Sequence, residues 1–116
     1  MLNVYGIKNC NTVKKALNWL NAHKIEYTFH DYKKEPAEEK QLIAWQKLVP
    51  WESLINKKGT TWKKLNPEQQ AAVVDEKSAR EILLAHNSMI KRPLIELENE
   101  LILGFDEQLY TEKLLK

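Results

Sequence analysis

The pattern of hydrophobic and polar residues from 2 to 32 predicts a strand, a helix and a second strand. Residues 2–6 (LNVYG) form a short apolar and aromatic run closed by a glycine, which is typical of a β-strand. Apolar residues then recur at helical spacing, at Val13, Ala16, Leu17 and Leu20. Residues 26–32 (EYTFHDY) are rich in β-forming side chains. We therefore expect a βαβ unit with a parallel strand pair and a right-handed crossover.

The middle of the chain has a helical pattern. Residues 36–49 open with proline and acidic residues and end before a second proline, which is the expected polarity of a helix. The pattern of residues 51–77 indicates short helices and turns. Residues 78–86 open with a capping box from Ser78 to Glu81, which predicts a further helix. We predict a helical insertion over about residues 36–88, which is longer than an ordinary connection.

The end of the chain predicts a hairpin and a helix. Residues 92–105 hold two apolar runs around "ENE", closed by Gly104, and Asp106 is placed to cap a helix over 107–116. The whole order is β-α-β, helical insertion, β-β-α. This is the order of an α/β thioredoxin-like fold with a helical subdomain, in a single domain over residues 1–116. That fold keeps a cis proline beside its active cysteine, at the position of Pro93.

Composition narrows the classes of partner. A chain of 116 residues with 43% hydrophobic residues can bury a core of its own. Its net charge of +2 predicts no direct nucleic-acid or membrane partner. A basic segment, KKGTTWKK at 57–64, fits a solvated helix–turn face about as well as a phosphate-binding surface. The start of the chain does not resemble a signal peptide, and the single cysteine allows no internal disulfide, so we expect a cytoplasmic protein.

The single cysteine, Cys10, lies at the predicted junction between the first strand and the first helix. Free backbone N–H groups at a helix N-terminus stabilise an anion, so a thiol there ionises more readily. Positive charge nearby comes from Lys8, Lys14 and Lys15. Side chains that could cap the helix or donate to the same anion are Asn9, Asn11 and Thr12. A lone cysteine is also commonly a small buried hydrophobe, and these residues alone leave both interpretations open.

Two reactive-cysteine schemes are excluded. A Cys-x-x-Cys pair needs a second cysteine where the chain has Val13, and a phosphatase-like Cys-x5-Arg loop needs an arginine where it has Ala16. If Cys10 reacts, it does so as a monothiol, and the resolving thiol comes from another molecule. The histidines show no metal-ligand spacing, so we expect no metal site.

Segments along nearly the whole chain resemble the arsenate reductase ArsC/Spx family, and within it the small YffB-type ArsC-like proteins. They are "YGIKNCNTVKKALNWL", "FHDY", "LINKKGTTWKKLN", "IKRPLIE" and "LILGF". The resemblance implies a thioredoxin-like fold with an inserted helical subdomain. It also implies that Cys10 is the nucleophile.

The departures from this family bear on the substrate. Arsenate reductases of this type hold the oxyanion with three arginines. The first is present as Arg92; the second falls among residues 56–58, where Lys58 is the basic stand-in; the third falls at or beside Phe105, which carries no charge. Lysine does not replace the bidentate fork of arginine, so the departures disfavour efficient arsenate reduction.

The resemblance to YffB-like proteins implies a glutathione-dependent thiol reductase without a bound cofactor. Glutathione or glutathionylated thiols would be the partners, and Cys10 would attack the sulfur of a mixed disulfide. Lys58 and Arg92 would hold a glutathione carboxylate while the backbone at Pro93 pairs with the peptide portion. Two alternatives are an Spx-like regulator that binds the RNA polymerase α subunit and a weak arsenate reductase.

Overall fold

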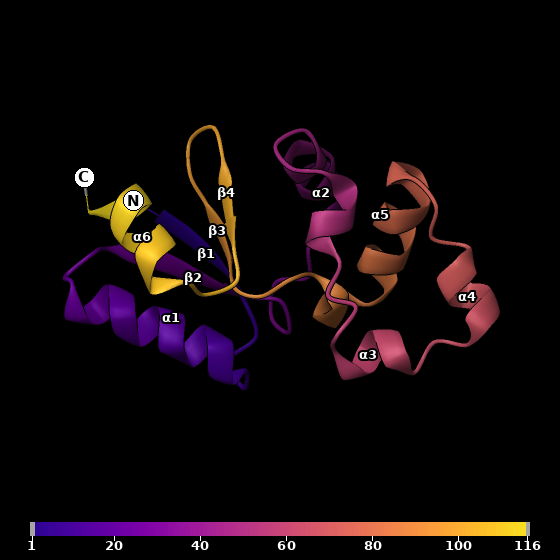
Figure 1. Ribbon diagram of the computed structural model, residues 1–116, viewed down its shortest axis with the longest axis horizontal. Coiled ribbons are helices and arrows are strands. Elements are labelled where there is room, and N and C mark those ends of the chain that lie inside the picture. The colour runs from indigo at the N-terminus through magenta and orange to yellow at the C-terminus, as the bar shows by residue number, and fades with distance from the viewer. Residues whose placement is uncertain (1, 116) are drawn as a thin grey trace.

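The computed structural model describes residues 2–115 and confirms the predicted order of elements (Figure 1). The first unit holds β1 (Leu2–Gly6), α1 (Asn11–Ala22) and β2 (Tyr27–Asp31). The insertion holds α2 (Glu39–Gln46), η1 (Trp51–Leu54), α3 (Thr60–Lys63), α4 (Pro67–Ala71), α5 (Glu76–Ala85) and η2 (Asn87–Met89). The chain then forms β3 (Leu94–Glu96), β4 (Leu101–Leu103) and α6 (Glu107–Leu114). Residues 1 and 116, which end the predicted domain and its last helix, lie outside the described residues.

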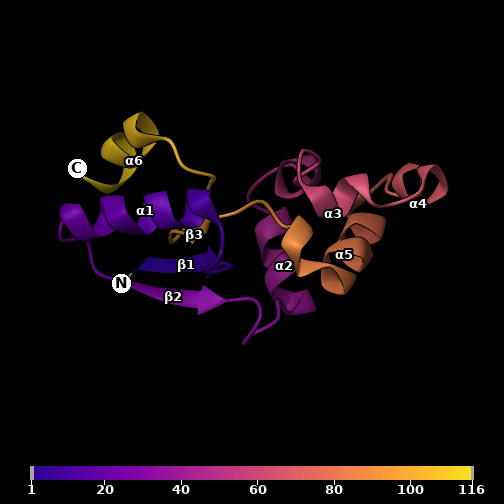
Figure 2. The ribbon, with the colours of Figure 1, turned by 90° about the horizontal axis from the view of Figure 1, so that it is seen from below.

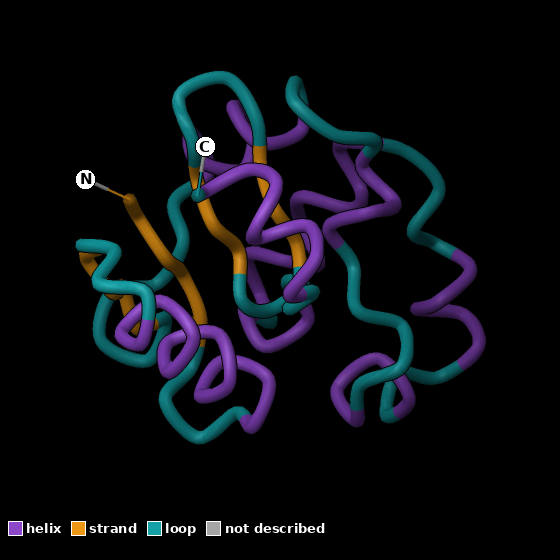
Figure 3. The backbone as a smooth tube through the Cα atoms, turned by 60° about the vertical axis from the view of Figure 1, so that its left-hand side comes forward, coloured by secondary structure: helices purple, strands orange, loops and turns teal. Residues whose placement is uncertain are grey.

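The strands form one mixed sheet in the order β2-β1-β3-β4. β1 pairs in parallel with β2, and α1 is the crossover between them, as predicted. β1 also pairs antiparallel with β3, so that Tyr5 lies opposite Leu94. β3 and β4 form the predicted hairpin, whose loop extends beyond the two strands (Figure 3). This is the thioredoxin-like arrangement expected from the sequence.

The two faces of the sheet are covered by different parts of the chain. α1 and α6 lie on the same side (Figure 2), where Val4 and Ile102 pack in one buried cluster with Leu20 and Tyr110. Because successive strand residues point to opposite faces, Tyr5 belongs to the other buried cluster, which is built mainly from the insertion. The molecule is accordingly elongated, with extents of 45 × 27 × 26 Å. No helix within residues 2–115 has the length and apolar character needed to cross a membrane.

The start of α5 differs from the prediction. The predicted capping box from Ser78 to Glu81 is wrong, because the helix begins earlier and Asp75 is its N-cap. The Asp75 carboxylate accepts the backbone N–H of Ser78 (2.8 Å), and the Ser78 hydroxyl accepts the backbone N–H of Asp75 (3.0 Å). Ser78 is therefore the third helical residue, and its hydroxyl completes a reciprocal cap that places the helix start three residues earlier.

This cap predicts a measurable acid sensitivity. Hydrogen bonds from the backbone and then the side chain of Ser78 lower the pKa of Asp75. A lowered folded-state pKa means that the stabilisation is complete above about pH 4 and is lost as the pH falls further. Asp75→Asn keeps an acceptor but does not titrate. We expect its melting temperature, followed by circular dichroism, to fall less than that of the wild type between about pH 5 and pH 2. Parallel curves for the two proteins would contradict this assignment.

Candidate active site

Cys10 lies where β1 has ended and α1 begins. It is the N-cap of α1, with an extended backbone (φ −111°, ψ 124°), and its carbonyl accepts the N–H of Lys14 (3.0 Å). Among residues 2–115 no side chain caps this helix end, and its first turn holds no acidic residue. The expected capping by Asn9, Asn11 or Thr12 is therefore wrong, because Cys10 itself occupies the cap position and their side chains are exposed. The first-turn N–H groups are left without a side-chain acceptor beside the thiol.

The burial of Cys10 separates the two interpretations left open by the sequence. Cys10 is partly exposed, and neither buried cluster of the described chain includes it. A cysteine used only as a small core residue is normally fully buried. The structure therefore favours the reactive interpretation over the packing one.

Gly6 sets the path of the chain from β1 to Cys10. A Cβ atom added at Gly6 would lie 2.9 Å from Cγ2 of Val13 in the first turn of α1. The end of the strand therefore passes directly against the start of the helix, at a separation that leaves no room for a side chain. This close contact holds the thiol-bearing end of α1 against the end of β1.

Arg92 and Pro93 reach the same end of the sheet from the other side. The Arg92–Pro93 peptide bond is cis, Pro93 is buried, and its carbonyl accepts the N–H of Gly104 (2.9 Å). Because Tyr5 pairs with Leu94, the residues just before β3 lie beside the residues just after β1. The topology thus brings Arg92 and Pro93 to the sheet end from which the chain runs to Cys10.

Lys58 comes from the insertion. Residues 54–56 run antiparallel to residues 89–91, through bonds from Asn56 N–H to the Met89 carbonyl (2.8 Å) and from Lys91 N–H to the Leu54 carbonyl (2.7 Å). Lys58 is exposed in the turn that follows. α3 begins just beyond that turn, on the side of the insertion that faces the N-terminal end of α1 (Figures 1 and 2). Lys58 is thus carried by the insertion, in the turn directly before α3.

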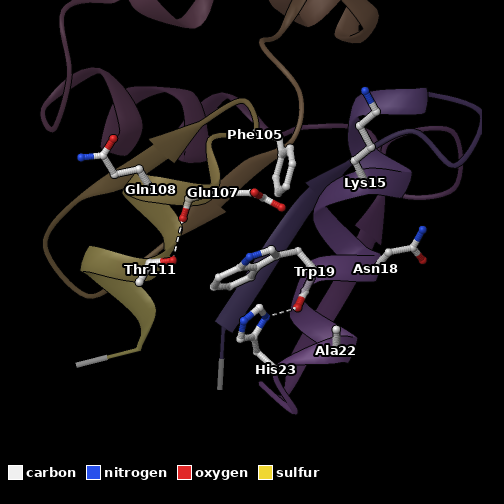
Figure 4. A pocket seen from close by; sticks show the side chains of 9 residues that line it. All are labelled: Lys15, Asn18, Trp19, Ala22, His23, Phe105, Glu107, Gln108 and Thr111. Carbon is white, nitrogen blue, oxygen red and sulfur yellow. Dashed lines mark hydrogen bonds between the residues drawn. The ribbon is translucent and has the colours of Figure 1, made fainter.

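Phe105 packs against a neighbouring aromatic side chain. The Phe105 ring meets the Tyr110 ring edge to face, 5.1 Å between centroids. It lines a surface pocket of about 860 Å³ between α1 and α6 (Figure 4). The other lining residues are Lys15, Asn18, Trp19, Ala22, His23, Glu107, Gln108 and Thr111. Of these, Lys15 is one of the lysines that the sequence placed near Cys10. Phe105 therefore provides apolar contact and no charge.

A buried polar group that the sequence did not single out lies just after β2. Tyr32 follows β2 and is only 3% exposed, yet its hydroxyl has no hydrogen-bond partner within residues 2–115. The buried Nε atoms of Arg80 and Arg92 also lack one within that range. Burial, and then Tyr5, raises the pKa of Tyr32, while the charge of Arg92 opposes the rise. The sequence motif "FHDY" places Tyr32 at a strand end but contains no signal of an unpaired hydroxyl.

The sequence also gave no sign of a chain of hydrogen bonds that runs across the sheet. The Glu96 carboxylate accepts Nε1–H of Trp45 (2.8 Å) and the amide of Asn3 (3.2 Å), and Asn3 is in turn bonded to His30 (3.0 Å). The Trp45 ring also meets the Tyr5 ring edge to face (5.0 Å). These contacts fasten α2 to the sheet and so fix the insertion relative to Cys10. Within the described residues no group of three or more His, Cys, Asp or Glu side chains could hold a metal ion.

Comparisons with known proteins agree with this arrangement. The family model described as "ArsC family" matches residues 5–113. An uncharacterized protein of Haemophilus influenzae is 41% identical over 110 residues, which is 95% of this chain and 96% of that protein. Among solved structures, the protein YFFB is similar at 42% identity and a TM-score of 0.93, covering 98% of this chain and 99% of that one. An arsenate reductase (ArsC) related protein from Brucella melitensis is 48% identical with a TM-score of 0.77, over 97% and 92% of the two chains.

A more distant relative is named as a transcriptional regulator. The global transcriptional regulator Spx of Streptococcus pneumoniae is 24% identical over 92% of this chain and 80% of that protein.

The contact at Gly6 predicts the effect of adding a single methyl group. Gly6→Ala forces either Val13 or the start of α1 to move, and we expect a loss of about 1–3 kcal/mol in the free energy of unfolding, measured in urea. In a Val13→Ala background the overlapping methyl is absent, so the same change should cost less. An equal cost in both backgrounds would show that this contact does not position the helix.

Proposed function

The chain belongs to the ArsC family, and from that premise we propose that it is a monothiol oxidoreductase that reduces glutathionylated thiols with Cys10 as nucleophile. The observation that carries the proposal is the setting of Cys10. It is a partly exposed thiol at an uncapped helix N-terminus, at the sheet end shared with the cis Arg92–Pro93 bond. Free N–H groups at a helix N-terminus interact favourably with anions, and thiol–disulfide exchange needs an accessible sulfur.

The proposed reaction proceeds through two exchanges. The Cys10 thiolate attacks the glutathione sulfur of a mixed disulfide, so that a Cys10–glutathione disulfide forms and the substrate leaves as a thiolate, which takes a proton. The thiolate of a second glutathione then attacks the glutathione sulfur bound to Cys10. This step releases glutathione disulfide and restores the Cys10 thiolate. In sum, one reduced glutathione is consumed and one glutathione disulfide is released for each glutathionylated thiol that is reduced, and no bound cofactor takes part.

The proposed binding groups lie on two parts of the molecule, the sheet with its flanking helices and the helical insertion. Arg92 and Lys58 supply positive charge for glutathione carboxylates from opposite sides, and the exposed side chains of Asn9, Asn11 and Thr12 border the thiol. Since the Pro93 carbonyl already accepts the N–H of Gly104, the pairing proposed at Pro93 would use the backbone of Arg92 next to it. The peptide portion of glutathione would then lie alongside the start of β3.

Arsenate reduction is the less favoured reaction for this site. The third arginine position holds Phe105, whose ring packs against Tyr110. A charged side chain there would have to leave this apolar contact. The remaining charges at the predicted positions are Arg92 and Lys58, and lysine does not supply a bidentate fork for an oxyanion.

A regulatory role of the Spx kind is the second candidate, supported by the relatives named Spx that match 92% of the chain. It requires binding to the RNA polymerase α subunit and does not require a reactive thiol. The absence of a cysteine at Val13 removes the disulfide switch but not an interaction surface. A pull-down with the C-terminal domain of the α subunit distinguishes this candidate from the enzyme.

For the enzyme we propose a cytoplasmic location, where glutathione is kept reduced.

The proposal predicts one stable covalent intermediate. Wild-type protein mixed with glutathione disulfide should acquire a single glutathione, detected by mass spectrometry, and keep it until reduced glutathione is added, because the chain holds no resolving cysteine. Cys10→Ser should acquire none and should lose activity toward a glutathionylated peptide by about a thousandfold or more. The assay measures glutathione disulfide release. Wild-type protein that forms no adduct, or a serine variant with normal activity, would refute the proposal.

A further inference from the structure

The charged residues are distributed unevenly along the chain. Residues 7–15, 53–67 and 82–95 contain no aspartate or glutamate, although the chain has 16 acidic residues. The same three segments contain half of the 18 lysines and arginines. The net charge of +2 therefore conceals a local separation of positive from negative charge.

The first and third of these segments meet through the sheet. Residues 7–15 follow β1 and contain Cys10, and residues 82–95 lead into β3. The pairing of Tyr5 with Leu94 places the end of the third segment beside the start of the first. Positive charge from both segments is thus brought to the end of the sheet that carries the thiol.

The second segment is fastened to the third. Backbone hydrogen bonds join residues 54–56 to residues 89–91, and the hydroxyls of Thr61 and Ser88 are bonded to each other (2.7 Å). In both ribbon views α3 lies on the side of the insertion that faces the N-terminal end of α1 (Figures 1 and 2). All three acid-free segments therefore contribute to one side of the molecule, around the start of α1.

We call the exposed lysines on this side, other than Lys58, the basic face. Its members are Lys8, Lys14, Lys57, Lys63, Lys64 and Lys91. In the part of the chain that the structure describes, none of these lysines takes part in an ion pair. Lys57 has one close partner, the Trp62 ring, with Nζ 5.3 Å from its centroid. Unpaired charges of one sign, with no acidic residue between them, produce a positive potential that attracts anions.

Another exposed part of the insertion has the ordinary mixture of charges. In α5 the two signs alternate, since Glu76 is followed by Lys77 and Arg80 by Glu81. Protein surfaces generally intersperse both signs, and a large surface of one sign is typical of a binding or steering role. The basic face therefore requires an explanation beyond solubility.

Glutathione alone does not account for this much positive charge. The tripeptide has two carboxylates, which the proposed contacts with Lys58 and Arg92 would use. The basic face offers six further positive charges, and Cys10 lies between two of them, Lys8 and Lys14, in the chain. A nucleic acid would match the charge but has no sulfur for the neighbouring thiol, so a protein thiol fits both features.

We propose that the basic face binds acidic residues that flank the glutathionylated cysteine of a protein substrate, so that the enzyme prefers thiols in acidic segments. This inference rests on the proposed function, because it names the substrate class of the same site. The exchange of sulfur bonds is the one described above, and the basic face contributes only to binding.

The experiment uses two glutathionylated peptides that differ only in charge. Each has one glutathionylated cysteine, with two glutamates on either side in the acidic peptide and two lysines on either side in the basic peptide. At low ionic strength we expect kcat/KM to be roughly tenfold or more higher for the acidic peptide. In about 0.5 M NaCl the difference should fall to about twofold or less, because salt screens exposed charges. The assay measures glutathione disulfide release.

A charge reversal tests the basic face directly. In Lys57→Glu/Lys91→Glu the preference for the acidic peptide should fall roughly tenfold, and kcat/KM for the basic peptide should exceed the wild-type value. Such a gain cannot result from unfolding, and comparing two peptides on one protein cancels any change in thiol reactivity. Lys40→Glu/Lys77→Glu is the matched control. These exposed lysines lie in the first turns of α2 and α5, outside the basic face, and their reversal should leave the preference unchanged.

A binding measurement gives a readout that does not depend on the reaction. Cys10→Ser cannot exchange, so fluorescence anisotropy of labelled peptides reports binding alone. We expect its dissociation constant for the acidic peptide to be roughly tenfold lower than for the basic peptide, and to rise with salt. A single-stranded RNA that binds more tightly and displaces the acidic peptide would assign the basic face to nucleic acid and overturn the inference.

The outcomes separate this inference from the proposed function. Salt-sensitive preference of Cys10→Ser for the acidic peptide, with no exchange in the wild type, supports the inference and refutes the proposed function. Exchange at equal rates on both peptides overturns the inference alone. Absence of both exchange and charge-dependent binding overturns both. Equal loss of preference in the two double variants would trace it to net charge and overturn the assignment to this face, as would a face variant that gains nothing on the basic peptide.

Discussion

The antiparallel pairing of β1 with β3 is the contact on which the rest of the structure depends. It joins the start of the chain to a strand that follows the whole insertion, with Tyr5 opposite Leu94. A shift of one residue in this register would turn every side chain of a strand to the opposite face. Val4 would then lose its packing on the α1 side, and Tyr5 its contact with α2. The same register brings the residues that follow β1 beside those that precede β3, and so assembles the site.

The insertion is held to this sheet at two places. Trp45 of α2 is bonded to Glu96 at one of them, and the short pairing of residues 54–56 with residues 89–91 lies at the other. The second attachment ends directly before Arg92, so the segment that leads to Lys58 is tied by backbone hydrogen bonds to the segment that leads to Pro93.

The polar groups inside the protein differ in how they are satisfied. The partly buried Glu96 carboxylate and the buried Tyr110 hydroxyl have their hydrogen bonds inside the protein and stabilise the fold. The Tyr32 hydroxyl and the Nε atoms of Arg80 and Arg92 have none within the described residues. Folded proteins normally satisfy such groups, so each unpaired one lowers the stability of the fold.

The sequence by itself determined the elements, because hydrophobic periodicity and turn residues act locally. It predicted the parallel pair, the hairpin and the cap at Asp106, and together with the family resemblance it singled out Cys10. Its errors were at local choices between competing partners: Asp75 displaced Ser78 as a cap, and Cys10 took the cap position from its polar neighbours. Only the tertiary structure decided that the Phe105 ring packs against Tyr110, that Lys58 is exposed in a turn of the insertion, and that the buried Tyr32 hydroxyl has no hydrogen-bond partner within residues 2–115. These features depend on contacts between residues far apart in the chain, which exist only once the sheet has brought its strands into register.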